Sequence, residues 1–189
     1  MNHFKKITNI PAFDIESTIA HLFDSGEIEW DEHNQICLTS VPGKEDNIYF
    51  GKNSLQYDWE ASYTDQNGNL IVPERNTIYD ETDFTEICTP FRGTPIEDLI
   101  NHLRTKYVLG RIRLMRSWPK TCLSWHTDTT CRLHYPIDTQ EGCLMIIEDE
   151  VKHLEKGKWW FTNTVLPHTA INASKQPRVH LVIAIVDTF

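Results

Sequence analysis

The chain has 189 residues, of which 40% are hydrophobic and 24% are charged, and its formal net charge at pH 7 is -9. A chain of this length is most simply one domain around one core, so we expect residues 1–189 to fold as a unit. The negative charge makes nucleic acid and anionic membranes poor partners. No stretch reaches the ~18 consecutive apolar residues of a membrane helix.

The N-terminus and the cysteines bear on the cellular compartment. Lys5 and Lys6 are not followed by an apolar segment, which argues against a secretory signal. The five cysteines are odd in number and form no C-x-x-C pair, which suits reduced thiols better than a disulfide framework. These features predict a cytoplasmic protein.

The first half of the chain predicts one helix followed by irregular structure. Residues 11–25 have apolar side chains at helical spacing, with Asp14 as a possible N-cap and Gly26 as a possible stop. Residues 27–91 alternate short apolar runs with turn sequences, which predicts short strands and long loops. The segment 53–63 mixes aromatic and polar residues, so it is either a lid over a substrate or a packed amphipathic loop.

A second predicted helix covers residues 94–107. Thr94 is its N-cap, Pro95 is at the first helical position, and Glu97 can complete a capping box. Its apolar stripe consists of Ile96, Leu99, Ile100, Leu103 and Tyr107. We expect this helix to have a structural role.

After Gly110 the pattern changes to short strands separated by polar breaks. Strands are predicted at residues 111–118, 121–126, 132–137, 143–148, 159–162 and 178–186. Strands of this length and spacing indicate a sandwich or barrel. Residues 1–109 are therefore expected to flank a β core formed by residues 110–189.

Three residues in the β region form a candidate metal site. His126 and Asp128 are two residues apart, so on an extended strand their side chains point to the same face. His168 is the third candidate, because inward-facing residues from distant strands converge inside a barrel or jelly roll. Two histidines and one carboxylate suit a non-haem Fe(II) oxygenase. Each histidine alone is more often a core or surface residue, so the prediction depends on the whole set.

Arg178 follows His168 by ten residues and begins a long apolar run. An oxygenase of this type needs a two-electron donor, and 2-oxoglutarate binds the metal with its keto acid while its far carboxylate needs a protein partner. A guanidinium binds such a carboxylate bidentately and stays charged when buried. We expect Arg178 to bind it; the alternative is a surface arginine at a strand start.

From about Gly110 onward the sequence resembles the aspartyl/asparaginyl β-hydroxylase branch of the Fe(II)/2-oxoglutarate dioxygenases. The matching motifs are His126-Thr127, Cys131-Arg132-Leu133-His134, the segment H-L-E-K-G-K-W-W-F around Gly157, His168 and Arg178. The resemblance implies a cupin-like double-stranded β-helix, or jelly roll, so the expected fold class is mainly β with flanking helices. It also implies Fe(II), 2-oxoglutarate as cosubstrate and O₂.

The resemblance also assigns roles to individual residues. Carried over position by position, it implies Fe(II) on His126 and His168 and the far carboxylate of 2-oxoglutarate on Arg178. It places the metal-side carboxylate near Arg132 and His134.

The sequence departs from the family's pattern at two other positions, Asp128 and Met115. Asp128 replaces a glycine of the animal members and restores the three-ligand set of most 2-oxoglutarate oxygenases, which argues against a direct transfer of substrate. Met115 stands where the family offers a serine to the cosubstrate, so that contact is left open.

The predicted function is hydroxylation of an aliphatic C–H bond of an amino acid. A free amino acid, proline among the possibilities, is favoured because small stand-alone relatives fit the size of this chain. One alternative is the same reaction on an Asp, Asn or Pro side chain in a peptide or protein. Another is a cupin-like protein without catalysis that binds a small molecule or a metal.

A group of basic residues suggests how the substrate is bound. The cations near the candidate site are Arg111, Arg113, Arg116, Lys120 and Arg132. Strand alternation puts Arg113 and Arg116 on opposite faces. An inward arginine there, or Arg132, is predicted to bind the carboxylate of an amino-acid substrate; the alternative is that these are solvated strand charges.

Overall fold

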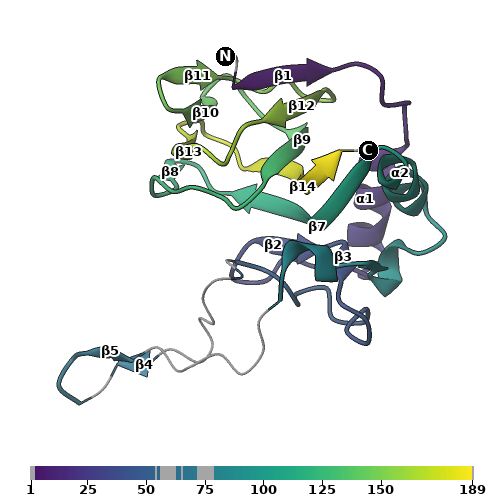
Figure 1. The fold of residues 1–189 in the computed structure, drawn as a ribbon, viewed down its shortest axis with the longest axis horizontal. Coiled ribbons are helices and arrows are strands. Elements are labelled where there is room, and N and C mark those ends of the chain that lie inside the picture. The colour runs from purple at the N-terminus through teal and green to yellow at the C-terminus, as the bar shows by residue number, and fades with distance from the viewer. Residues whose placement is uncertain (1–2, 54, 56–62, 65, 72–78, 189) are drawn as a thin grey trace.

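The structure is a computed structural model that describes residues 3–53, 55, 63–64, 66–71 and 79–188 (Figure 1). Its helices are α1 (Ile15–Asp24), α2 (Pro95–Arg104) and the 3₁₀ turns η1 (Glu81–Asp83) and η2 (Thr89–Phe91). The strands are β1 (Phe4–Ile7), β2 (Gln35–Cys37), β3 (Thr39–Ser40), β4 (Tyr63–Thr64), β5 (Leu70–Ile71), β6 (Glu86–Ile87), β7 (Tyr107–Ser117), β8 (Thr121–Cys122), β9 (Cys131–Asp138), β10 (Cys143–Ile147), β11 (Glu150–Lys152), β12 (Trp159–Thr162), β13 (His168–Asn172) and β14 (Arg178–Thr188). No helix in these ranges is long and apolar enough to cross a membrane.

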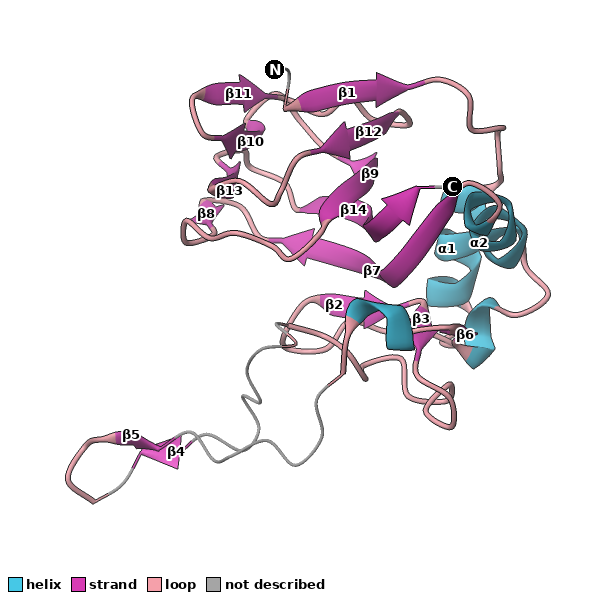
Figure 2. Cartoon of the chain, in the orientation of Figure 1, coloured by secondary structure: helices cyan, strands magenta, loops and turns pink. Residues whose placement is uncertain are grey.

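Two antiparallel sheets form the β core (Figure 2). The larger has the order β1-β12-β9-β14-β7-β2, and the smaller has the order β11-β10-β13-β8. The eight strands from β7 to β14 are divided between the two sheets, as in a jelly roll. In the larger sheet, β14 lies between β7 and β9, and β9 also pairs with β12. This confirms the predicted fold class, mainly β with flanking helices.

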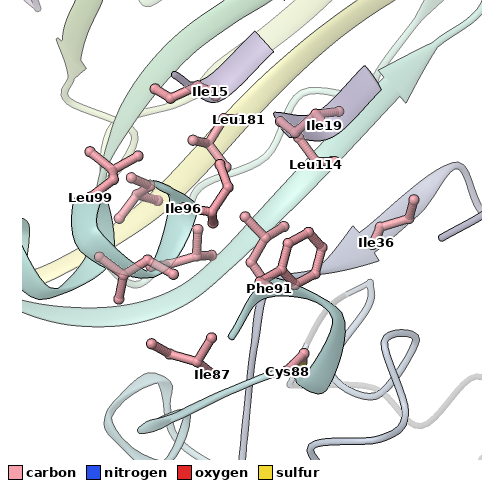
Figure 3. Packing of buried hydrophobic residues seen from close by; sticks show 14 of the residues in the cluster. Ile15, Ile19, Ile36, Ile87, Cys88, Phe91, Ile96, Leu99, Leu114 and Leu181 are labelled. Atoms are coloured by element: carbon pink, nitrogen blue, oxygen red, sulfur yellow. The ribbon is translucent and has the colours of Figure 1, made fainter. Parts of the chain in front are cut away.

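The main hydrophobic core lies between the six-stranded sheet and the helices. Leu114 of β7 and Leu181 of β14 pack near Ile96 of α2 and Ile15 of α1 (Figure 3). Side chains alternate along a strand, so the residues next to Leu114 and Leu181 point to the other face of the sheet, toward the interior of the jelly roll. That inner face carries mostly polar residues, which are described below.

The predicted helices are present but shorter than expected. Helix α2 begins as predicted, with the Thr94 hydroxyl accepting from the Ile96 amide at 3.2 Å. Glu97 does not complete a capping box, because its carboxylate accepts from the Gly93 amide instead. The N-cap of α1, Asp14, makes no capping hydrogen bond with its side chain, which accepts from the Ser17 hydroxyl.

The predicted strands agree with the observed strands to different degrees. The predicted strand at 159–162 coincides with β12, whereas the one at 121–126 shrinks to β8 at Thr121–Cys122. Strands β1, β11 and β13 were not predicted.

Most of the segment 53–63, a possible lid, lies outside the described residues. The five cysteines are all free of disulfide bonds.

Candidate active site

Backbone pairing brings His126 and His168 together. The His126 amide donates to the His168 carbonyl (3.1 Å) and the His168 amide to the His126 carbonyl (2.9 Å), forming an isolated antiparallel bridge. Residues paired directly in this way project their side chains from one face, and the ring centroids lie 4.2 Å apart. Asp128 continues the pairing, because its amide donates to the Thr164 carbonyl at 2.9 Å. The main chain thus fixes the relative positions of the three predicted ligands.

Each histidine ring is also held in one orientation. His126 Nδ1 lies 2.7 Å from the Ser124 carbonyl oxygen, and His168 Nδ1 lies 2.9 Å from the Leu166 carbonyl oxygen. A carbonyl can only accept, so both Nδ1 atoms carry the proton and both Nε2 atoms keep a free lone pair. A metal-binding histidine is oriented by this kind of hydrogen bond. The tautomers needed for binding through Nε2 are therefore set before any metal arrives.

The three side chains offer a compact set of donor atoms. The ligand atoms of His126, Asp128 and His168 all lie within 4.8 Å of one another, and Asp128 Oδ2 is 3.7 Å from His168 Nε2. One ion bound at about 2 Å by each ligand needs these atoms within about 4 Å of one another, so the three side chains would move slightly closer together to share it. His168 is buried, Asp128 is half-buried and His126 is exposed. The residues present therefore fit a three-ligand metal site that reaches from the interior to solvent.

Arg132, predicted to bind the cosubstrate, lies directly behind Asp128. Its Nε is 3.3 Å from Asp128 Oδ2, and its Nη2 is 3.5 Å from Glu81 Oε1. Glu81 also forms a two-pronged ion pair with Arg111, whose Nε and Nη2 lie 3.1 and 2.9 Å from its two carboxylate oxygens. A continuous row of alternating charges therefore runs from Arg111 to Asp128, one of the predicted metal ligands.

Glu81 gives this network a dependence on pH. Burial raises the pKa of Glu81, but hydrogen bonds and charge from Arg111 and the charge of Arg132 outweigh it and lower the pKa from 4.5 to about 2. The folded-state pKa is below the unfolded one, so this stabilisation is complete above pH 4.5 and is lost as the pH falls from 4.5 toward 2.

We therefore expect acid to destabilise the wild-type chain more than a double variant, Glu81→Gln with Arg111→Gln. By pH 3 the difference should reach about 2 kcal/mol of unfolding free energy, because about 1.5 pH units, from 4.5 down to 3, have then been crossed. Urea unfolding of both proteins, from neutral pH down to about pH 3, measures it. All other titrating groups are common to the two proteins, so equal pH slopes would contradict the assignment to Glu81.

Two arginines of the inner face are buried without an acidic partner among the described residues. Arg113 is 7% exposed, and its Nη1 donates to the Gln35 side chain and the Asn53 carbonyl, while its Nε has no acceptor there. Burial, then the charges of Arg111 and Arg132, lower the Arg113 pKa to about 9. Arg178 is 9% exposed, and its Nε likewise finds no acceptor in the described part of the chain. An unpaired buried guanidinium is costly, so both positions favour an anionic ligand.

His134 and His180 form a neutral pair next to these charges. Their Nδ1 atoms are 3.4 Å apart, so one donates and the other accepts. Burial, followed by the charges of Arg178, Arg132 and His168, lowers the pKa of His134 to about 3, and burial also lowers that of His180. Neither Nε2 has a partner among the described residues. The pair therefore offers one donor and one acceptor at neutral pH.

Ser117 and His180 are inner-face residues that the sequence predictions missed. Ser117 is paired directly with Arg178 in the β7–β14 ladder, and its buried hydroxyl has no partner in the described ranges. Met115 is paired with His180, one step along the same face. The serine beside the predicted carboxylate-binding arginine is thus Ser117, two residues beyond Met115. Strand alternation could have identified both, because Ser117 shares a face with Met115 and His180 shares one with Arg178.

Arg116 lies on the opposite face of β7 from Arg113. Its Nε and Nη2 donate to the Asn34 side-chain oxygen at 2.9 and 2.6 Å, and its guanidinium stacks between Trp30 and Trp118, 4.6 and 4.3 Å from their ring centres. These contacts hold the guanidinium of Arg116 on the outer face of the sheet. Of the two arginines considered from sequence, the structure turns only Arg113 inward.

Two solved structures show a partial likeness to the chain. A cupin domain from Bordetella pertussis Tohama I is 22% identical with a TM-score of 0.35, covering 40% of this chain and 79% of that one. An oxidoreductase of the 2OG-Fe(II) oxygenase family from Burkholderia pseudomallei is 15% identical with a TM-score of 0.38, covering 48% and 47%. The jelly-roll assignment rests on the strand order of the chain itself.

Sequence similarity is stronger. L-proline cis-4-hydroxylase from Rhizobium meliloti (strain 1021) is 39% identical over 138 residues. These cover 66% of this chain and 46% of the relative, so the chain spans less than half of that protein's length. Residues 44–188, well over half of the chain, match the family described as aspartyl/asparaginyl beta-hydroxylase. The chain belongs to the aspartyl/asparaginyl β-hydroxylase family.

Proposed function

We propose that the chain is an Fe(II)/2-oxoglutarate-dependent hydroxylase of a free amino acid. The main observation behind this proposal is that the ligand atoms of two histidines and one aspartate lie within 4.8 Å of one another. The inner face of the six-stranded sheet also holds two buried arginines without acidic partners among the described residues. Family membership supports the reaction class. The relative named for 4-hydroxylation of L-proline supports an amino-acid substrate.

His126, Asp128 and His168 would hold the metal. When bound, Fe(II) together with 2-oxoglutarate and O₂ supplies the oxidant that places one oxygen atom in a C–H bond. The protein's own contribution is to present two Nε2 lone pairs and one carboxylate while leaving the remaining coordination positions open. The hydrogen bonds to the backbone keep both rings in the required orientation.

The inner face would hold the cosubstrate. Arg178 has a buried guanidinium with no acidic partner in the described part of the chain, as the far carboxylate of 2-oxoglutarate needs, and the Ser117 hydroxyl beside it adds a donor. Arg132 and His134 would contact the metal-side carboxylate. The low pKa of His134 keeps it neutral at pH 7, so a donated Nε2 hydrogen bond brings no added positive charge. A dianion also offsets the excess of buried arginines over buried acids.

Arg113 would hold the substrate carboxylate. It is inward-facing and buried, and no acid among the described residues pairs with it, whereas Arg132 already contacts two carboxylates and Arg116 faces outward. A free amino acid supplies the missing anion. An Asp, Asn or Pro within a peptide has no free α-carboxylate, so this position favours the free amino acid.

Arg113→Met is expected to raise the KM for the amino-acid substrate by about 10- to 100-fold. This rise corresponds to the loss of one charge-assisted hydrogen bond, worth roughly 1.5–3 kcal/mol. Arg116→Met, the matched change on the outer face of the same strand, should leave that KM unchanged. Succinate formation with L-proline, followed by other free amino acids, measures the effect. Unchanged kinetics in Arg113→Met would remove the substrate assignment.

Anaerobic spectroscopy tests the proposed function without knowledge of the substrate. Fe(II) is added to the purified chain, then 2-oxoglutarate, and the visible charge-transfer band of the chelate is recorded for wild type and Asp128→Ala. A band in wild type supports the metal and cosubstrate assignments, and its weakening in the variant supports Asp128 as the third ligand. Absence of both iron and band in wild type would leave a cupin-like protein without this reaction.

A further inference from the structure

We infer that Glu81 is a positioning residue for the metal centre and acts through Arg132, an inference that rests on the proposed function. Arg132 bridges two carboxylates: its Nε contacts Asp128 Oδ2 at 3.3 Å, and its Nη2 lies 3.5 Å from Glu81 Oε1. Glu81 is far from Asp128 in sequence, but its buried side chain, 7% exposed, is separated from that proposed metal ligand only by the Arg132 side chain.

The fold is shaped to hold Glu81 at this point. The Arg111 amide, Nε and Nη2 all donate to its carboxylate, at 2.8, 3.1 and 2.9 Å. Gly110 leaves the necessary room, because a methyl group there would lie 2.6 Å from Glu81 Oε2 and 2.7 Å from its Cβ. Both distances are well inside van der Waals contact. A side chain held by three donors and a required glycine has a fixed position from which to orient Arg132.

The positive charge of Arg132 is shared between Glu81 and Asp128. With Glu81 in place, Arg132 divides its attraction between two carboxylates, which leaves Asp128 negative enough to bind a cation. Without Glu81, Arg132 pairs with Asp128 alone and competes with the metal for it. The same loss makes the inner face more positive, which favours an anion. Removing the charge of Glu81 should therefore weaken metal binding and leave 2-oxoglutarate binding equal or tighter.

Calorimetric titration of the full chain with Co(II), then with 2-oxoglutarate at saturating Co(II), tests this prediction. Glu81→Gln should bind Co(II) about tenfold more weakly, the usual effect of losing an outer partner of a metal ligand, and should bind 2-oxoglutarate at least as tightly as wild type. Asp83→Asn is the matched control: it makes the same chemical change in η1, at a residue whose side chain accepts from the Asp80 amide and pairs with neither Arg111 nor Arg132. It should behave as wild type toward both ligands.

Three other outcomes for Co(II) and 2-oxoglutarate binding contradict the inference, and a second variant covers a failure to fold. Equal Co(II) affinity in wild type and Glu81→Gln overturns it, and so does a parallel loss of both ligands, which indicates a loosened fold. If wild type itself binds no Co(II), the proposed function fails and this inference fails with it. If Glu81→Gln does not fold because Arg111 is left buried and unpaired, the double variant Glu81→Gln/Arg111→Gln replaces it. The same tenfold loss of Co(II) affinity supports the inference there, and wild-type affinity overturns it.

Discussion

His168→Ala is expected to abolish stable iron binding and to reduce turnover to background. His168 is the buried member of the ligand set, and its Nε2 is 3.7 Å from Asp128 Oδ2. Losing only an outer partner of a ligand typically costs about 10- to 100-fold in metal affinity, so losing the ligand itself should cost more than about 100-fold. Iron content after anaerobic reconstitution and desalting measures the first effect, and succinate formation measures the second.

The control for this substitution is His21→Ala. His21 is an exposed histidine on α1, outside the inner face, so its removal should change neither iron content nor turnover. Iron retained in equal amounts by His168→Ala and wild type would show that the cluster of His126, Asp128 and His168 is not the binding site.

Arg178→Met is expected to change cosubstrate binding and stability in opposite directions. The KM for 2-oxoglutarate should rise by about 100-fold or more, because two charge-assisted hydrogen bonds are each worth roughly 1.5–3 kcal/mol. The ligand-free protein should become more stable by roughly 1–3 kcal/mol, because a buried guanidinium without an acidic partner among the described residues is replaced by an apolar side chain of similar length.

Two measurements separate these effects. Steady-state kinetics with varied 2-oxoglutarate gives the KM, and urea unfolding of the ligand-free protein gives the stability. Arg92→Met serves as the control, since Arg92 is a half-exposed surface arginine whose nearest acid, Glu86, is 3.8 Å away. A fall in stability together with an unchanged KM would indicate that Arg178 supports the fold and does not bind the cosubstrate.

Much of the fold could be predicted because local signals agreed with tertiary structure. The apolar pattern at 159–162 gave β12 with its observed bounds, and the start of α2 followed from Thr94. Strand β1, with the sequence F-K-K-I, has no alternation and is held by pairing with β12. Strand β13 is short and contains weak strand formers, so it too depends on its neighbours.

Only part of the candidate site could be predicted from the sequence. The spacing of His126 and Asp128 predicted a shared face, and the structure brings both close to His168. Glu81 could not have been found from the sequence, because it belongs to a region of turns and reaches Arg132 across 51 residues of chain. No spacing rule connects such a pair.

The separation of the two faces of the six-stranded sheet has a consequence for how this protein can diversify. The apolar layer under α1 and α2 supplies most of the packing, whereas the arginines and histidines proposed to bind ligands lie on the opposite side of the same strands. Because side chains alternate along β7 and β14, neighbouring residues face either the apolar core or the inner face. Substrate preference can therefore change through inward positions such as Arg113, while the outward positions preserve the apolar packing. Arg111 is the exception on this face, because its ion pair with Glu81 stabilises the fold, and a mutational library of inward positions should leave it unchanged.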